Sequence, residues 1–211
     1  MLDWPDIPAF CISLRDSPRR PEFAASATAH SVAFEFFDAI SPADLYRGPV
    51  IKDCRVDVTD LRWTQHQQTD PRRQQAPLLL TEICCAYSHI MCWQIARSRD
   101  MDYVCIFEDD AIICRTLKGI KIPSSVDIFH LGDRIPHNWR GEITGDGCGA
   151  EGYILSRTGI LKCLEIFRIL YMPIDLQIMA HQLNNACKSP RLFDYRRDIG
   201  SEFYLTHQSV I

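Results

Sequence analysis

The sequence lacks the features that mark membrane-spanning, secreted and nucleic-acid-binding proteins. It contains no run of 18 apolar residues, so we expect no transmembrane segment. Its first residues are acidic and lack the basic flank and apolar stretch of a secretory signal. The net charge of −4 gives no basis for binding nucleic acid or an anionic membrane. We therefore predict a cytoplasmic protein without nucleic-acid partners, whose membrane association is at most peripheral, at the inner face.

The ten cysteines contain no Cys-x-x-Cys pair. Without a secretory signal, we expect reduced thiols that act as small apolar side chains. Cys85, His89 and Cys92 are spaced four and three residues apart, so they share a face if this stretch is helical. A zinc site there would need a fourth ligand and supporting hydrogen bonds. We favour the simpler interpretation, in which these cysteines are core residues.

The length of 211 residues and the hydrophobic content of 46% predict a single domain over residues 1–211 with a sizeable core. Residues 41–77 are interrupted by prolines and are mostly polar from 64 to 75. Irregular segments of this length inside a compact domain are usually functional or disordered. We predict a mobile loop there that could close over a substrate.

The first forty residues predict a βαβ unit, with strands at 8–14 and 32–39 and a helix at 21–30. Such a unit implies a parallel sheet. In the turn after the first strand, Ser17 is the expected N-cap and Pro18 the expected first helical residue. Arg19 and Arg20 follow, where such folds bind a nucleotide, and they could contact a phosphate or cover a uracil ring. A solvated basic turn is the alternative.

Residues 78–97 give the clearest helical pattern, with Thr81 as the expected cap. Ser88 and His89 lie in its middle, where a structural role in the core and a role in a site are both open. Further strands are expected at 126–131 and 150–155. Helices are expected at 157–169, capped by Ser156, and from Pro173 onward, followed by a polar tail with strand-like pieces at 191–207.

The most informative stretch is 103–110, an apolar run that ends in Glu108, Asp109 and Asp110. Carboxylates are rarely buried without a partner, so we expect the strand to leave the core here and enter a polar cleft. In extended geometry Glu108 and Asp110 point to the same side. Such a pair can hold Mg²⁺ or Mn²⁺ through oxygen. The alternative is a helix N-terminus, where acids are also favourable.

Taken together, these motifs resemble glycosyltransferase family 25, the lipooligosaccharide sugar transferases related to procollagen galactosyltransferases. The stretches that carry the resemblance are 12–14 with Arg20, 80–89 with Trp93, 106–110, 149–159 and, more weakly, 173–175. The usual Gly-Glu-Ile-Gly-Cys of the family reads Thr81-Glu82-Ile83-Cys84-Cys85 here, and its Asp-Arg pair reads Arg15-Asp16. The implied fold is α/β and GT-A-like (Rossmann-like), a single domain with a central, mostly parallel sheet flanked by helices.

The resemblance also implies a function and a site. It implies inverting, metal-dependent transfer of a hexose, galactose or glucose, from a UDP-sugar to a saccharide acceptor such as lipooligosaccharide, with Mn²⁺ or Mg²⁺ as cofactor. The residues expected in these roles are Glu108 and Asp110 for the metal; Ser13, Arg20, Ser88, His89, Glu108 and Asp109 for the donor; and Asp175, or second Glu151, as the catalytic base.

Alternatives remain open. Asp175 could be no more than a first-turn acid of its helix. The chain could also be a UDP-sugar hydrolase, an inactive sugar-nucleotide-binding relative, or an interaction domain whose acids bind no metal.

Overall fold

A computed structural model describes residues 7–46, 54–56, 78–117, 120–132, 149–181, 183–187 and 193–195. Its centre is a six-stranded sheet in the order β2-β1-β4-β7-β6-β9. The strands of this sheet are β1 (Ala9–Ser13), β2 (Glu35–Asp38), β4 (Tyr103–Glu108), β6 (Ile128–His130), β7 (Gly152–Ser156) and β9 (Asn185–Cys187). The helices are α1 (Arg20–Ala29), α2 (Pro42–Tyr46), α4 (Leu80–Ser98), α5 (Arg157–Ile166) and α6 (Ile174–Ala180).

The sheet is mixed but mostly parallel. β1 pairs in parallel with β2 and with β4, and β6 pairs in parallel with β9. β7 is antiparallel to both of its neighbours, β4 and β6. The carboxyl ends of β1, β2, β4 and β6 therefore share one edge, which is where ligands bind in open α/β sheets. The predicted α/β class and the βαβ unit at the N-terminus are confirmed.

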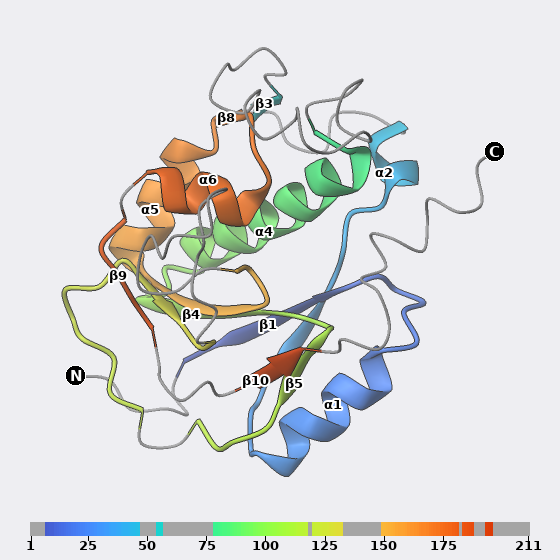
Figure 1. Cartoon of the computed structure of the whole chain (residues 1–211), viewed down its shortest axis with the longest axis vertical. Coiled ribbons are helices and arrows are strands. Elements are labelled where there is room, and N and C mark those ends of the chain that lie inside the picture. Colours follow the sequence, from blue (N-terminus) through green and yellow to red (C-terminus); the bar gives the residue numbers. More distant parts are fainter. Residues whose placement is uncertain are drawn as a thin grey trace, which may run out of the picture.

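Helices cover both faces of the sheet, with α4, α5 and α6 on one side and α1 on the other (Figure 1). Side chains along β4 point alternately to the two faces of the sheet, so the strand contributes to the hydrophobic core on each face. Val104 and Ile106 pack in the cluster that contains Trp93 of α4, whereas Cys105 and Phe107 pack in the cluster that contains Phe23 of α1. A strand buried on both faces needs apolar residues at every position, which explains the continuous apolar run in the sequence.

Two predicted helix caps, Ser17 and Thr81, are wrong. Helix α1 begins at Arg20 with Arg19 at the N-cap, and Ser17 instead donates to Asp109. Helix α4 begins at Leu80 rather than being capped by Thr81. The Glu82 carboxylate accepts a hydrogen bond from the backbone N–H of the N-cap residue Leu79 (2.9 Å), which is the bond that the N3 acid makes in a capping box.

The acid-bearing strand is shorter than predicted. β4 ends at Glu108, Asp109 and Asp110 form a turn, and the chain continues as β5 (Ala111–Ile113), which pairs with β10 (Phe193–Tyr195). The expected extended geometry from Glu108 to Asp110 is therefore not observed. Consequently, each of the three acids has a different environment.

Part of the segment predicted as a loop, 41–77, is regular. Pro42–Tyr46 form α2, and β3 (Arg55–Val56) pairs in parallel with β8 (Ile169–Leu170). The rest of that predicted mobile loop lies outside the described residues. Eight cysteines in the described part of the chain are free thiols, namely Cys11, Cys54, Cys84, Cys85, Cys92, Cys105, Cys114 and Cys163. No helix in that part combines the length and apolarity needed to cross a membrane.

Candidate functional site

A cavity of about 190 Å³ opens at the carboxyl edge of the sheet, beside the N-terminal half of α4. The ends of β1 and β4, the β1–α1 turn, the segment after β2 and helix α4 all contribute to its wall. Its polar and sulfur-bearing lining residues are Ser13, Arg19, Thr81, Cys84, Cys85, Ser88, Glu108, Asp109 and Asp110. Helix α4 and β4 therefore meet at the acids, as expected if α4 lies antiparallel to the strand that follows it.

Asp109 ties the β1–α1 turn to the end of β4. Ser13 Oγ and Ser17 Oγ donate to its Oδ2 (2.6 and 2.7 Å), and Arg19 donates to its Oδ1 (3.3 Å). Both side chains of the Arg19–Asp109 ion pair are more than nine-tenths buried. Asp109 therefore holds these two segments together, and both of its carboxylate oxygens accept hydrogen bonds from protein side chains.

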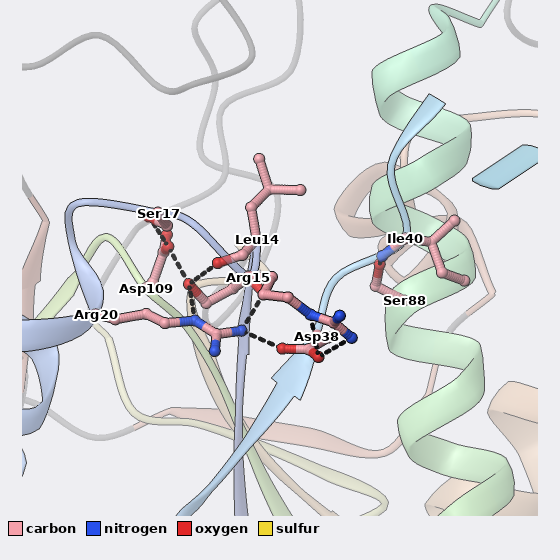
Figure 2. A network of polar contacts seen from close by, with 9 residues as sticks. Leu14, Arg15, Ser17, Arg20, Asp38, Ile40, Ser88 and Asp109 are labelled. Carbon is pink, nitrogen blue, oxygen red and sulfur yellow. Dashed lines mark hydrogen bonds and ion pairs between the residues drawn. The ribbon is translucent and has the colours of Figure 1, made fainter. Parts of the chain in front are cut away.

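Arg20 and Asp38 form a second network beside the cavity (Figure 2). Arg20 donates to the Ser13 carbonyl (2.9 Å) and to Asp38 Oδ1 (2.5 Å), and its guanidinium lies over the Phe36 ring. Arg15 donates to the other oxygen of Asp38. Hydrogen bonds from Arg20 and then Arg15 hold the pKa of Asp38 below its usual value. Sequence reasoning missed Asp38, although its place at the end of the second strand of a βαβ unit points to the same edge.

A buried relay of hydrogen bonds ends at Glu108. Trp93 Nε1 donates to Tyr153 Oη (3.0 Å), Tyr153 Oη lies 2.7 Å from His89 Nδ1, and His89 Nε2 lies 3.0 Å from Glu108 Oε1. The indole N–H can only donate, and an ionised carboxylate can only accept. The protons of the relay are thus ordered, with Tyr153 donating to His89 Nδ1 and His89 Nε2–H donating to Glu108.

His89 is fully buried, and burial lowers its pKa to about 3. It is therefore the neutral tautomer with its proton on Nε2. The ring does not reach the rim of the cleft, because it stacks on Tyr153 inside the core. It nevertheless contacts the site through Glu108, which lines the cavity. Neither Tyr153 nor Trp93 was recognised as part of this arrangement from the sequence.

Asp110 differs from its neighbours. Its Oδ1 is buried and has no hydrogen-bond partner among the described residues. Burial, reinforced by the Glu108 carboxylate, raises the pKa of Asp110 to about 7, against the lowering effect of Arg19. A divalent cation coordinated by Glu108 and Asp110 would satisfy this orphaned oxygen and both carboxylates, so the residues present fit an oxygen-liganded metal.

The two candidate bases, Glu151 and Asp175, both follow His89 in the sequence, and the charges of both act on it in the folded chain. Asp175 and Glu151 both act to raise the His89 pKa, and Asp175 also acts on Cys85. Asp175 Oδ1 accepts from the Leu176 N–H (2.9 Å), so it also has the helix-start role considered as an alternative. The Glu151 carboxylate folds back over Gly149, whose φ of +98° and absent Cβ give it room: an added Cβ would lie 2.0 Å from Glu151 Oε2.

Ser88 lies in the cavity wall, but its hydroxyl is engaged. It donates to the Cys84 carbonyl (2.8 Å) and accepts from the Ile40 N–H (2.9 Å), which fastens the segment after β2 to helix α4. Figure 2 shows Ser88 beside Ile40. Ser13 is similarly engaged with Asp109 and Arg20. In this structure, both serines hold the walls of the cavity in place.

Comparison with known proteins gives one family. Residues 6–124 match glycosyltransferase family 25, described as LPS biosynthesis proteins. A Haemophilus influenzae protein named as a glycosyltransferase is 32% identical over 127 residues, which cover 60% of this chain and 38% of that protein. The lipooligosaccharide biosynthesis protein lic2B of Haemophilus influenzae is 25% identical over 175 residues, 72% of this chain and 60% of the relative. The chain thus spans less than two thirds of these relatives.

Among solved structures, the fold is similar to that of a variant of Drosophila β-1,4-galactosyltransferase 7, which was crystallised with manganese, UDP-Gal and xylobiose. The alignment covers 97% of this chain and 75% of the galactosyltransferase chain. The sequence identity is 12% and the TM-score is 0.40. A likeness this low does not bear on the function of the present chain.

Proposed function

Since the chain belongs to glycosyltransferase family 25, we propose that it transfers a hexose, galactose or glucose, from a UDP-sugar to a saccharide acceptor. The name of the lipooligosaccharide relative suggests an acceptor of that class. The observation that carries the proposal is the carboxylate pair Glu108 and Asp110 at the sheet edge, with one buried oxygen of Asp110 unpartnered among the described residues. This is the chemistry expected of a site for a metal-bound diphosphate.

Glu108 and Asp110 would hold Mn²⁺ or Mg²⁺, and the bound ion would offset charge that develops on the departing UDP. Neighbouring side chains hold both carboxylates in position for the ion. His89 holds Glu108 in one orientation through a hydrogen bond, and Asp109, locked by three donors, fixes the turn from which Asp110 projects. Because the chain turns after Glu108, the three acids have different roles: Glu108 and Asp110 face the ion, and Asp109 fixes the turn.

The nucleoside is expected to bind beside Arg20 and Asp38. An ionised carboxylate next to a cavity can accept hydrogen bonds from ribose hydroxyls, and the arginine can donate to phosphate. Both side chains are held by neighbours rather than free to move, since Arg20 contacts Ser13, Asp38 and Phe36. Preorganisation of this kind reduces the ordering cost of binding.

Arg20→Ala is expected to weaken UDP binding by about 1–3 kcal/mol, because it removes a charge-assisted donor and releases Asp38. Isothermal titration with UDP and Mn²⁺ measures this directly. Arg15→Ala is the matched control: Arg15 also pairs with Asp38, but its side chain is 84% exposed, so UDP affinity should change little. Equal affinities in wild type and Arg20→Ala would show that Arg20 belongs to a solvated turn.

Inversion at the sugar carbon requires one base that removes a proton from the acceptor hydroxyl. We assign this role to Asp175, with Glu151 as the second candidate, because the charges of both act on His89, which contacts Glu108. Asp175→Asn should lower kcat by about a hundredfold or more, with the donor KM kept. The same loss in Glu151→Gln, with Asp175→Asn active, would reverse the assignment.

Donor turnover with and without acceptor tests the function as a whole. A transferase releases UDP from UDP-galactose or UDP-glucose mainly when a saccharide acceptor such as a truncated lipooligosaccharide is present, and excess chelator stops the release. Equal UDP release with and without acceptor would identify a hydrolase. No release, together with no stabilisation by UDP and Mn²⁺ in a thermal-shift assay, would contradict the proposal.

A further inference from the structure

Next to the carboxylate pair lies a second group of ligand atoms of a different chemical kind. Cys85 Sγ, His89 Nε2 and a Glu108 oxygen all lie within 4.8 Å of one another. Cys85 and His89 are four residues apart on α4, so they project from the same face, and Glu108 reaches them from the end of β4. Sequence spacing suggested Cys92 as the third member, but Cys92 is buried in the core and is not part of this group.

The distances within the group fit a tetrahedral ion. Zinc bonds of about 2.3 Å to sulfur and about 2.0–2.2 Å to nitrogen or oxygen place neighbouring ligands roughly 3.3–3.7 Å apart. Cys85 Sγ lies 3.6 Å from Glu108 Oε1, and His89 Nε2 lies 3.0 Å from the same oxygen. These two distances lie within a few tenths of an ångström of the values for a zinc site, and the third, between Cys85 Sγ and His89 Nε2, is no more than 4.8 Å.

The surroundings also suit a metal. Tyr153 Oη lies 2.7 Å from His89 Nδ1, the outer contact that orients a metal-binding histidine. On metal binding, the ion replaces the proton on His89 Nε2, the imidazole carries its proton on Nδ1 and donates it to the Tyr153 oxygen, and the Tyr153 O–H rotates away from Nδ1. The Cys85 thiol releases its proton to solvent. Cys85 and Glu108 both line the cavity, so an ion held by the group has a route from solvent and an open fourth position.

We propose that Cys85, His89 and Glu108 form a binding site for a thiophilic divalent cation, Zn²⁺ above all, distinct from the all-oxygen site of Glu108 and Asp110. Thiolate and imidazole select zinc, whereas Mg²⁺ and Mn²⁺ prefer carboxylate and water. Glu108 is shared by the two sites. Zinc bound by the cysteine and the histidine therefore withdraws Glu108 from the oxygen site and inhibits transfer in competition with Mn²⁺; this consequence rests on the proposed function.

Cobalt titration of the metal-free, full-length protein tests the site without donor or acceptor. We expect a thiolate-to-cobalt charge-transfer absorption that saturates at one equivalent and is abolished by Zn²⁺. Cys85→Ser should remove the absorption and weaken Zn²⁺ binding, measured against a chromophoric chelator, by about tenfold or more. Cys84→Ser, altered at the adjacent residue in the same cavity wall, should retain both.

An unchanged absorption in Cys85→Ser, or none in the wild type, would overturn the proposal in favour of a hydrogen-bonded cluster only. If Cys85→Ser does not fold, alkylation of the wild type followed by mass mapping replaces it: Zn²⁺ should protect Cys85 but not the exposed Cys114, and equal labelling with and without Zn²⁺ refutes the site.

Transfer assays then separate the two proposals. Competitive inhibition by Zn²⁺ that is about tenfold weaker in Cys85→Ser supports the shared use of Glu108. A cobalt absorption without any sugar transfer refutes the proposed function alone, whereas Mn²⁺-dependent transfer without the absorption refutes only the zinc site.

Discussion

Asp110→Asn is expected to abolish sugar transfer and, at the same time, to make the metal-free protein more stable above pH 7. Transfer is lost because asparagine supplies no charge to the metal. Stability rises because the native fold buries the Asp110 carboxylate, next to Glu108 and Asp109 and opposed only in part by Arg19. A buried carboxylate without a partner is unfavourable, and its neutral amide isostere removes that cost.

The sign of the pH dependence follows from the pKa. The native Asp110 carboxyl keeps its proton up to about pH 7, whereas the unfolded one releases it near the ordinary value of 3.8. Between these values the native state binds more protons, so the free energy of unfolding falls as the pH rises. Each pH unit is worth about 1.4 kcal/mol, so we expect a gain of about 1–4 kcal/mol for Asp110→Asn at pH 8.

Asp109→Asn provides the contrast at the adjacent position. Its carboxylate compensates the buried Arg19 and accepts from Ser13 and Ser17, so its neutralisation should destabilise the fold by about 2–4 kcal/mol. Thermal melts at pH 5 and pH 8 with EDTA, and again with Mn²⁺, measure both variants. Wild-type activity in Asp110→Asn, or activity in excess chelator, would end the metal-site hypothesis.

His89→Ala is expected to lose both stability and activity. The side chain is fully buried between Tyr153 and Glu108, so alanine leaves a cavity and removes a hydrogen-bond partner from each. We expect a loss of about 3–5 kcal/mol in the free energy of unfolding, a sum of cavity and unsatisfied-group costs. A histidine at the rim of the cleft would instead lower turnover with little change in melting temperature.

Two further variants separate the structural role of His89 from its effect on Glu108. Tyr153→Phe removes one hydroxyl at the centre of the relay and should cost about 1–3 kcal/mol, since Trp93 and His89 both lose their partner. His89→Gln keeps an N–H that can reach Glu108 and should restore part of the turnover lost in His89→Ala. Normal turnover per folded molecule of His89→Ala in the cold would show that the residue is structural only.

Local patterns in the sequence were enough to predict the class of the fold and the strand that carries the acids. The continuous apolar run before Glu108 requires burial on both faces, and a run of that kind is satisfied only inside a covered sheet. The βαβ pattern of the first forty residues fixes the parallel pairing of β1 and β2, because parallel strands need a crossover connection. These are local or periodic properties, which neighbouring residues in the chain encode.

The partners of the three carboxylates, in contrast, follow from how distant segments of the chain pack together. Glu108, Asp109 and Asp110 are consecutive acids in the sequence, yet one accepts from a buried histidine, one compensates a buried arginine, and one has a buried oxygen unpartnered among the described residues. Their partners lie 19 to 96 positions away along the chain. Spacing along a chain does not encode such contacts. They arise when β1, β4 and α4 pack together, and the free energy of burying each charge then sets its partner and its pKa.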